Sequence, residues 1–143
     1  MRGLYSMLSR LCGVGATLIA LSACGGDGTG LGGVTPATGT WSGTTSQSRA
    51  VSFEVTSQGI TSATLNYQLS GSACSYTATT TVGSSSPLPI TNGQFDTGSL
   101  QIGSNATMSA TGRFTSATQA NGTISIVDGD CGGSLNLTWN ASK

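Results

Sequence analysis

The feature that most constrains the fold is an alternation of apolar and polar residues that begins after residue 40. Val51, Phe53 and Val55 alternate with polar neighbours. The next run continues the pattern, and its apolar members are Ala63, Leu65, Tyr67 and Leu69. Successive side chains of a β-strand point to opposite faces, so a period of two indicates strands with one buried face. The two runs flank Gln58–Gly59, which predicts a hairpin turn between them.

The chain beyond residue 71 divides in the same way into short strands and turns. An inward face is expected for four residues at even positions, namely Cys74, Tyr76, Ala78 and Val82. Further strands are expected at 100–102, 106–114, 122–127 and 134–139. Turn residues lie at Asn92–Gly93, Gly103–Asn105, Asn121–Gly122 and Asp128–Asp130. Gly, Ser and Thr dominate the composition at the expense of helix formers. The sequence therefore predicts an all-β fold, an antiparallel β-sandwich or partly open barrel of about eight strands.

The N-terminal segment has the layout of a secretory signal peptide. Arg2 and Arg10 supply a basic end, an apolar run follows at 11–21, and the small residues Ser22 and Ala23 close the segment. The apolar run is too short to span a bilayer stably. We therefore expect residues 1–23 to be a signal peptide that is removed from the mature protein.

The four residues Leu21-Ser22-Ala23-Cys24 resemble the lipobox of bacterial lipoproteins. The resemblance implies that Cys24 carries a diacylglycerol, becomes the first mature residue and holds the protein to a membrane. Several acyl chains on one residue make release slow, because each buried methylene contributes ~0.8 kcal/mol. Gly25, rather than an aspartate, follows the cysteine, which by the family's sorting rule favours the outer membrane of the cell envelope. The alternative is a signal peptide cut elsewhere, with Cys24 an ordinary or disulfide-bonded thiol.

Residues 24–39 are rich in glycine and are expected to form a flexible linker between the lipid and a β-domain at 40–143. As a random coil this linker would span ~20 Å on average.

The cysteine count points to one disulfide. Of four cysteines, Cys12 would be removed with the signal peptide and Cys24 would be lipidated, which leaves Cys74 and Cys131. An exported domain lies in an oxidising space, so these two are expected to pair, with two buried free thiols as the alternative. Such a bond stabilises a fold by ~4 kcal/mol in the chain-entropy model. Strand parity predicts that both cysteines point into the core or along its rim.

The ionisable residues offer little chemistry. The chain has no His, and its acidic residues are Asp27, Glu54, Asp96, Asp128 and Asp130. After removal of the signal peptide the net charge is about minus two, so no nucleic-acid binding is expected. No catalytic residue, cofactor or metal is predicted, since base catalysis and triads usually need a histidine. The catalytic alternative is a glycosidase in which Glu54 and Asp96 face each other across a cleft.

Asp128-Gly129-Asp130 allows two interpretations. Two carboxylates beside a glycine can offer oxygens to Ca²⁺, but calcium loops usually recruit more ligands. We predict a turn before the last strand, and calcium binding by Asp128 and Asp130 is the alternative.

Several phrases occur in an order that resembles a family of small secreted bacterial β-domains, often found on lipoproteins. They are 39–43, 51–55, 90–95, 111–118, 131–133 and 137–139, and the resemblance covers most of residues 39–141. This family pairs a cysteine in mid-domain with one before the last strand. The resemblance implies a β-sandwich of no established activity and transfers no catalytic residue.

Two functions are compatible with these observations. The first is a membrane-anchored lipoprotein that displays a non-catalytic domain with an interaction or structural role, its protein partner unidentified. The alternative is a glycan-binding module, in which polar strand residues bond sugar hydroxyls and an aromatic ring stacks on the sugar. Exposure of Trp41, Trp139, Tyr67 or Tyr76 would discriminate between them, and parity places the last three inward. We expect Trp139 to be mostly buried, with the first and last strands side by side or packed across the core.

Overall fold

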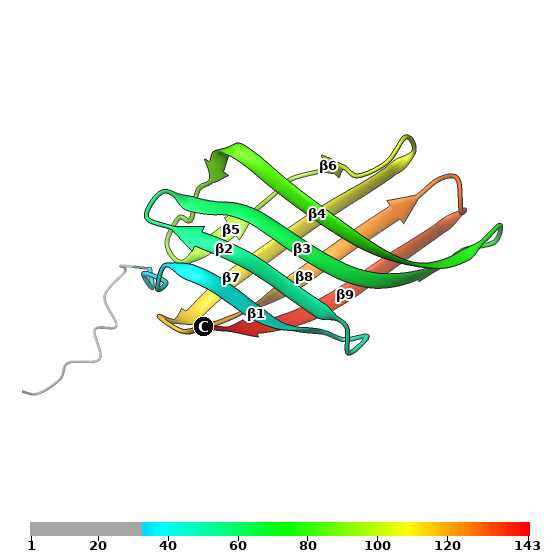
Figure 1. Cartoon of the computed structure of the whole chain (residues 1–143). Helices are drawn as coiled ribbons and strands as arrows, with labels where there is room; N and C mark the ends of the chain where they lie inside the picture. Colours follow the sequence, from blue (N-terminus) through cyan, green and yellow to red (C-terminus); the bar gives the residue numbers. More distant parts are fainter. Residues whose placement is uncertain (1–32) are drawn as a thin grey trace, which may run out of the picture.

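The computed structural model describes residues 33–143, which form one antiparallel sheet with no helix in this part of the chain (Figure 1). The strands are β1 Gly39–Thr45, β2 Ala50–Thr56, β3 Gly59–Ser70, β4 Ser75–Leu88, β5 Gln94–Asp96, β6 Leu100–Gln101, β7 Ala106–Ser116, β8 Gln119–Asp128 and β9 Gly133–Ser142. Their order in the sheet is β4-β3-β2-β1-β9-β8-β7-β5, and β6 also pairs with β7.

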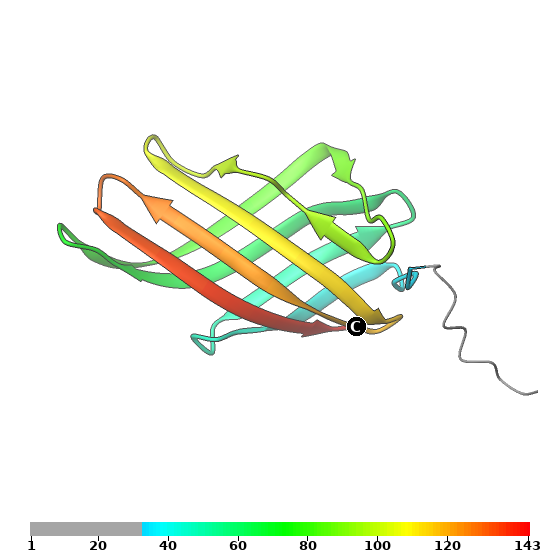
Figure 2. The same ribbon diagram turned by 180° about the vertical axis from the view of Figure 1, so that it is seen from behind.

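The sheet curls into a half-barrel. In Figure 1 strands β1 to β4 lie in front, and the view from behind in Figure 2 shows β7, β8 and β9 with β5 and β6. The first and last strands pair side by side, with Ser42 opposite Ser142 and Thr45 opposite Trp139. The prediction of an all-β antiparallel fold is therefore confirmed. Of the two arrangements left open, the chain adopts the partly open barrel and not a sandwich of two separate sheets.

The inner face of the curled sheet holds the core, as the alternation predicts. Trp41 and Trp139 are 0 % and 3 % exposed. The ring of Trp41 stacks on Phe53 with centroids 5.8 Å apart, and Phe53 meets Trp139 edge-on at 5.6 Å. Such ring pairs contribute stability beyond the apolar area they bury. Tyr67 is also buried and Tyr76 is half-buried, so the predicted inward faces are confirmed.

Most predicted turns are confirmed, and one is wrong. Asn92 and Gly93 have φ of 52° and 71°, the left-handed pair that a tight hairpin requires. Asn121–Gly122, by contrast, lies inside β8. Gly122 is needed there for close approach, because a Cβ at this position would collide with the carbonyl of Thr111 and lie 2.8 Å from the indole of Trp139. The short strand β5 was not predicted.

The residues just before β1 pack against the sheet. The amide of Ala37 donates to the carbonyl of Ala117 (2.8 Å), and the indole of Trp41 donates to the carbonyl of Ala37 (2.9 Å). Val34 packs against the core beside the turn at Gly93. Residues 33–38, which the sequence assigned to the linker, therefore contact the β-domain. The signal peptide and Cys24 lie outside the described residues.

Candidate functional site: an apolar cavity at the open side

The half-barrel is open between β4 and the pair β5–β6. These strands end the sheet on its two sides, since each pairs with the sheet along one edge only. Figures 1 and 2 show the two sides connected at one end by the turn that leads from β4 into β5, and no strand pairing joins β4 to β5 or β6. A cavity of about 360 Å³ lies in the curl beneath this opening and takes its walls from both sides.

The cavity is lined mainly by apolar side chains. Its floor is the inner face of the sheet, with Phe53, Leu65, Met108, Ile124 and Trp139. Its walls are Val82 and Leu88 on the β4 side and Phe95 and Leu100 on the opposite side. None of the described residues that line it carries a charge. The volume falls within the ~300–1,000 Å³ that small-molecule sites occupy, and apolar lining is typical of such sites.

Hydroxyl groups lie around the cavity among the apolar residues. Thr80, Ser84 and Ser86 come from β4, and Thr97 follows β5. The hydroxyl of Thr97 donates to the carbonyl of Gly98 (2.8 Å) and accepts from the amide of Ala110 (2.9 Å). A few polar groups in an apolar site are what orients a ligand that has one polar end.

Two glycines shape one wall of the cavity. Gly112 and Gly122 are opposite each other on β7 and β8, and their outer neighbours in the same row are Phe95 and Trp139. A Cβ on Gly112 would collide with the ring of Phe95. The two rings stack over the glycines with centroids 6.0 Å apart and an interplanar angle of 27°. The missing side chains thus let both rings, which line the cavity, lie against the strand backbone.

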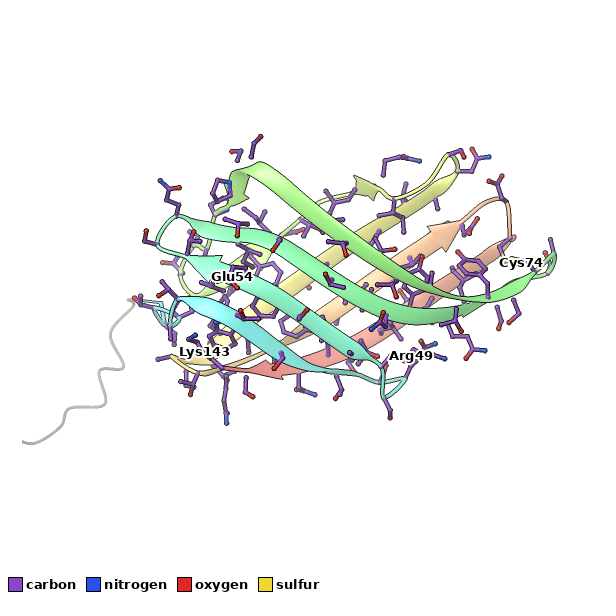
Figure 3. All side chains as sticks on the ribbon, in the orientation of Figure 1. Arg49, Glu54, Cys74 and Lys143 are labelled. Carbon is purple, nitrogen blue, oxygen red and sulfur yellow. A yellow bond between two sulfur atoms is a disulfide. The ribbon has the colours of Figure 1, made fainter. Side chains whose placement is uncertain are left out.

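The far end of the half-barrel is closed by a disulfide between Cys74 and Cys131, so the predicted pairing is present in the structure. Figure 3 shows Cys74 at the tip of the β3–β4 hairpin. The amide of Ala73 donates to the carbonyl of Cys131 (3.0 Å), which adds to the link between this hairpin and the loop before β9. Cys131 is 1 % exposed, whereas Cys74 lies on the surface at the rim.

A side-chain hydrogen bond reinforces the closed end. The hydroxyl of Tyr76 donates to Asp128 Oδ2 at 2.6 Å. This bond is the main cause of a raised pKa for Tyr76, with burial and the neighbouring Tyr67 adding to it. The same bond lowers the pKa of Asp128, helped by the backbone amides of Cys131 and Asp130. Both shifts favour the neutral phenol and the ionised carboxylate, the states that make the bond.

The turn predicted at Asp128–Asp130 is confirmed, and its carboxylates bond within the protein. Asp128 Oδ1 accepts from the amides of Asp130 (3.0 Å) and Cys131 (3.1 Å). Asp130 Oδ1 accepts from the side-chain amide of Asn105 at 2.6 Å. Across residues 33–143 no three His, Cys, Asp or Glu residues gather in a way that could hold a metal ion.

Glu54 and Asp96 are not brought together. Glu54 lies on the outward side of β2, labelled in Figure 3, and accepts from the hydroxyl of Thr40 at 2.8 Å. Asp96 is exposed on β5 and accepts from the amide of Gly98 at 2.8 Å. Strands β1, β9, β8 and β7 separate β2 from β5 in the sheet, and both carboxylates face away from the core. The arrangement therefore does not form the facing pair that a glycosidase needs.

A second, polar hollow of about 320 Å³ lies where β1, β9 and β8 meet. Its outward-facing lining residues are Ser42, Thr44, Thr115, Gln119, Asn121, Asn140 and Ser142. The described residues around it include hydroxyls and amides but no aromatic ring.

Sequence reasoning did not find the apolar cavity. The alternation predicts an inward face for some of the lining residues, among them Phe53, Leu65 and Val82, but an inward face can be filled or hollow. The outcome depends on how far the sheet curls, and the signal for it was the glycine pair Gly112 and Gly122 in mid-strand, one of which was interpreted as a turn.

No protein-family model, curated protein or solved structure matches this chain. In the part of the chain that the structure describes, no helix has the length and apolar character to cross a membrane.

Proposed function

We propose that this protein is a lipoprotein of the bacterial cell envelope, anchored through Cys24, whose β-domain is a non-catalytic binding module. A single observation supports the anchor. Residues 2–24 contain, in this order, a basic end, an apolar run, two small residues and a cysteine. By the sorting rule, Gly25 after the cysteine favours the outer membrane.

The apolar cavity supports an interaction role over a purely structural one. Protein interiors are normally packed to the density of organic crystals, with few voids larger than a water molecule. An apolar hollow of about 360 Å³ is large for a domain of this size and is open between two strand edges. A purely structural domain has no use for such a space, since filling it would increase stability.

The anchor is tested by replacing Cys24. The Cys24→Ser chain should accumulate as a precursor that takes up no labelled palmitate in the bacterial host. Cys12→Ser is the matched control, because it removes a thiol from the same segment and leaves Leu21-Ser22-Ala23-Cys24 intact. Equal labelling of Cys24→Ser and the parent chain would refute the anchor.

Glycan binding is the second candidate, and the polar hollow is the observation that favours it. Asn121, Asn140 and Gln119 can bond sugar hydroxyls there. The aromatic rings that would stack on a sugar are turned inward, since Trp41, Trp139 and Tyr67 are buried. A glycan array on which Asn140→Ala weakens binding by the chain would favour this candidate.

A further inference from the structure

We propose that the apolar cavity binds one acyl chain of a lipid taken from the adjoining membrane, the lipid's polar end remaining at the opening beside the β4 hydroxyls. The proposal deepens the function above and rests on it for the position of the domain at a membrane. The cavity itself stands independently of the anchor.

The lining fits a hydrocarbon better than it fits a polar ligand. Floor and walls are formed by Phe53, Leu65, Met108, Val82 and Leu100, and the described lining includes no charge. Burial of a methylene in such surroundings contributes ~0.8 kcal/mol, so a chain of several methylenes supplies useful affinity without a single hydrogen bond.

The opening suits a long molecule with one polar end. It runs between the edges of β4 and of β5–β6, each of which pairs with the sheet on one side only in the described residues, so a flexible chain can enter from the side. Ser84 and Ser86 on β4 place hydroxyls beside the apolar walls. Hydroxyls can hydrogen-bond a carboxyl, an ester or a glycerol group, whichever ends the chain.

The position of the cavity in the fold favours a membrane source. Pro87, Leu88 and Pro89 line the cavity, and two residues separate them from the turn Asn92–Gly93, against which Gly33 and Val34 pack. The described chain thus begins, at Gly33, beside the turn between β4 and β5, and residues on both sides of this turn line the cavity (Figure 1). Nine residue steps from Cys24 to Gly33 reach at most ~30 Å, which keeps the cavity close to the bilayer that holds the anchor.

A photoreactive fatty acid tests the proposal. The full lipoprotein, purified from membranes and placed in phosphatidylcholine vesicles, is irradiated with palmitic acid that carries a diazirine near its methyl end. Cross-linked residues are then mapped by mass spectrometry. We expect them within 60–65, 80–88 and 108–110, on the inner face. Cross-links confined to outward-facing positions would overturn the proposal.

Two matched substitutions separate the cavity from the rest of the surface. Ala110 lines the cavity, and Thr111, the next residue on β7, is exposed on the outer face. Ala110→Trp should reduce inner-face labelling by about tenfold or more, whereas Thr111→Trp should leave it within about twofold. Equal labelling of the two variants contradicts the proposal. If Ala110→Trp does not fold, the pair Ala63→Phe and Thr64→Phe on β3 makes the same comparison.

The Cys24→Ser chain, assayed with the same probe, separates the lipid source from the anchor. Inner-face labelling equal to that of the parent supports a lipid taken from the membrane. Labelling that rises several-fold once the anchor is absent would show that the protein's own acyl chain fills the cavity, which overturns the proposed source. If Cys24 proves unlipidated while the inner face is still labelled, the anchor fails and the acyl-chain site stands.

Discussion

Two parts of this half-barrel, the closed end at Cys74 and the open side at β4, differ in how their neighbouring segments are held together. At the closed end a disulfide, backbone hydrogen bonds and the Tyr76–Asp128 contact tie the β3–β4 hairpin to the loop before β9. At the open side the edges of β4 and β5–β6 remain apart over an apolar cavity. One end of the fold is therefore held by a covalent bond and specific hydrogen bonds, whereas the opposite side keeps an unfilled opening.

The largest change in stability is expected when Trp139, on the floor of the cavity at the open side, is replaced. Trp139 is 3 % exposed, packs on Phe53 and Phe95, and lies over Gly122. Trp139→Ala should lower the free energy of unfolding by ~3–5 kcal/mol, because it removes a buried indole and widens an existing cavity. Chemical denaturation measures the change. Asn140→Ala, the exposed neighbour on the same strand, should stay within about 0.5 kcal/mol. Retained stability with loss of polysaccharide binding in Trp139→Ala would instead identify the indole as a glycan platform.

The next effect concerns the closed end. The double variant Cys74→Ser, Cys131→Ser should lose about 2–4 kcal/mol of stability, since the bond restricts an unfolded loop whose ends are 57 residues apart. The parent chain should yield a Cys74–Cys131 peptide in non-reducing mass spectrometry. Both thiols reacting freely with an alkylating agent in the native, unreduced protein would remove the basis of the comparison, because the two ends would then be held by packing alone.

The difference between the two ends also marks what the sequence could predict. The alternation at 51–55 and 63–69 assigned the strand faces, because a period of two is a property of the strand itself. The disulfide followed from counting cysteines in a chain that the sequence predicts to be exported. Both predictions use only local sequence or composition. The cavity could not be predicted in this way, because it depends on the curl of the whole sheet and on how far β4 lies from β5.

Two Asn-Gly dipeptides show most clearly what local sequence could not predict. Asn92–Gly93 and Asn121–Gly122 are the same dipeptide, yet the first is a turn and the second lies in mid-strand. Gly122 lies under an indole contributed by β9, the next strand in the sheet. Local sequence cannot distinguish a glycine needed for its φ from one needed for space.

A smaller change, this time an increase in stability, is expected when a larger side chain fills part of the cavity. Ala63 on β3 lines the open side, and Thr64 beside it faces outward. Ala63→Leu should raise stability by about 0.5–2 kcal/mol, because added methylenes occupy space that no side chain uses. Thr64→Leu, which adds similar bulk outside, should give no such gain in thermal unfolding. Destabilisation by Ala63→Leu would mean that the wall cannot accept the extra volume, and that the open side is packed more like the closed end.

The smallest effect is a pH dependence confined to the closed end. The folded-state pKa of Asp128 is lowered, first by the Tyr76 hydroxyl, so its contribution is complete above the unfolded value of ~3.9 and is lost as the pH falls through the folded pKa. The folded-state pKa of Tyr76 is raised, so its contribution is present below ~10 and is lost as the pH rises through the folded value. Stability should therefore decline at both extremes.

Tyr76→Phe isolates this contribution, because it keeps the ring that packs edge-on against Tyr67 and removes only the donor. We expect a small loss of stability near neutral pH, less than that of the disulfide variant, and a flatter decline below pH ~4 and above ~10. The amides of Asp130 and Cys131 still bond Asp128 in the variant, so part of the acid decline should persist. Melting temperatures at a series of pH values measure both limbs. If the parent and Tyr76→Phe curves stay parallel at both extremes, the hydrogen bond does not contribute to closing this end, and the disulfide and backbone contacts suffice.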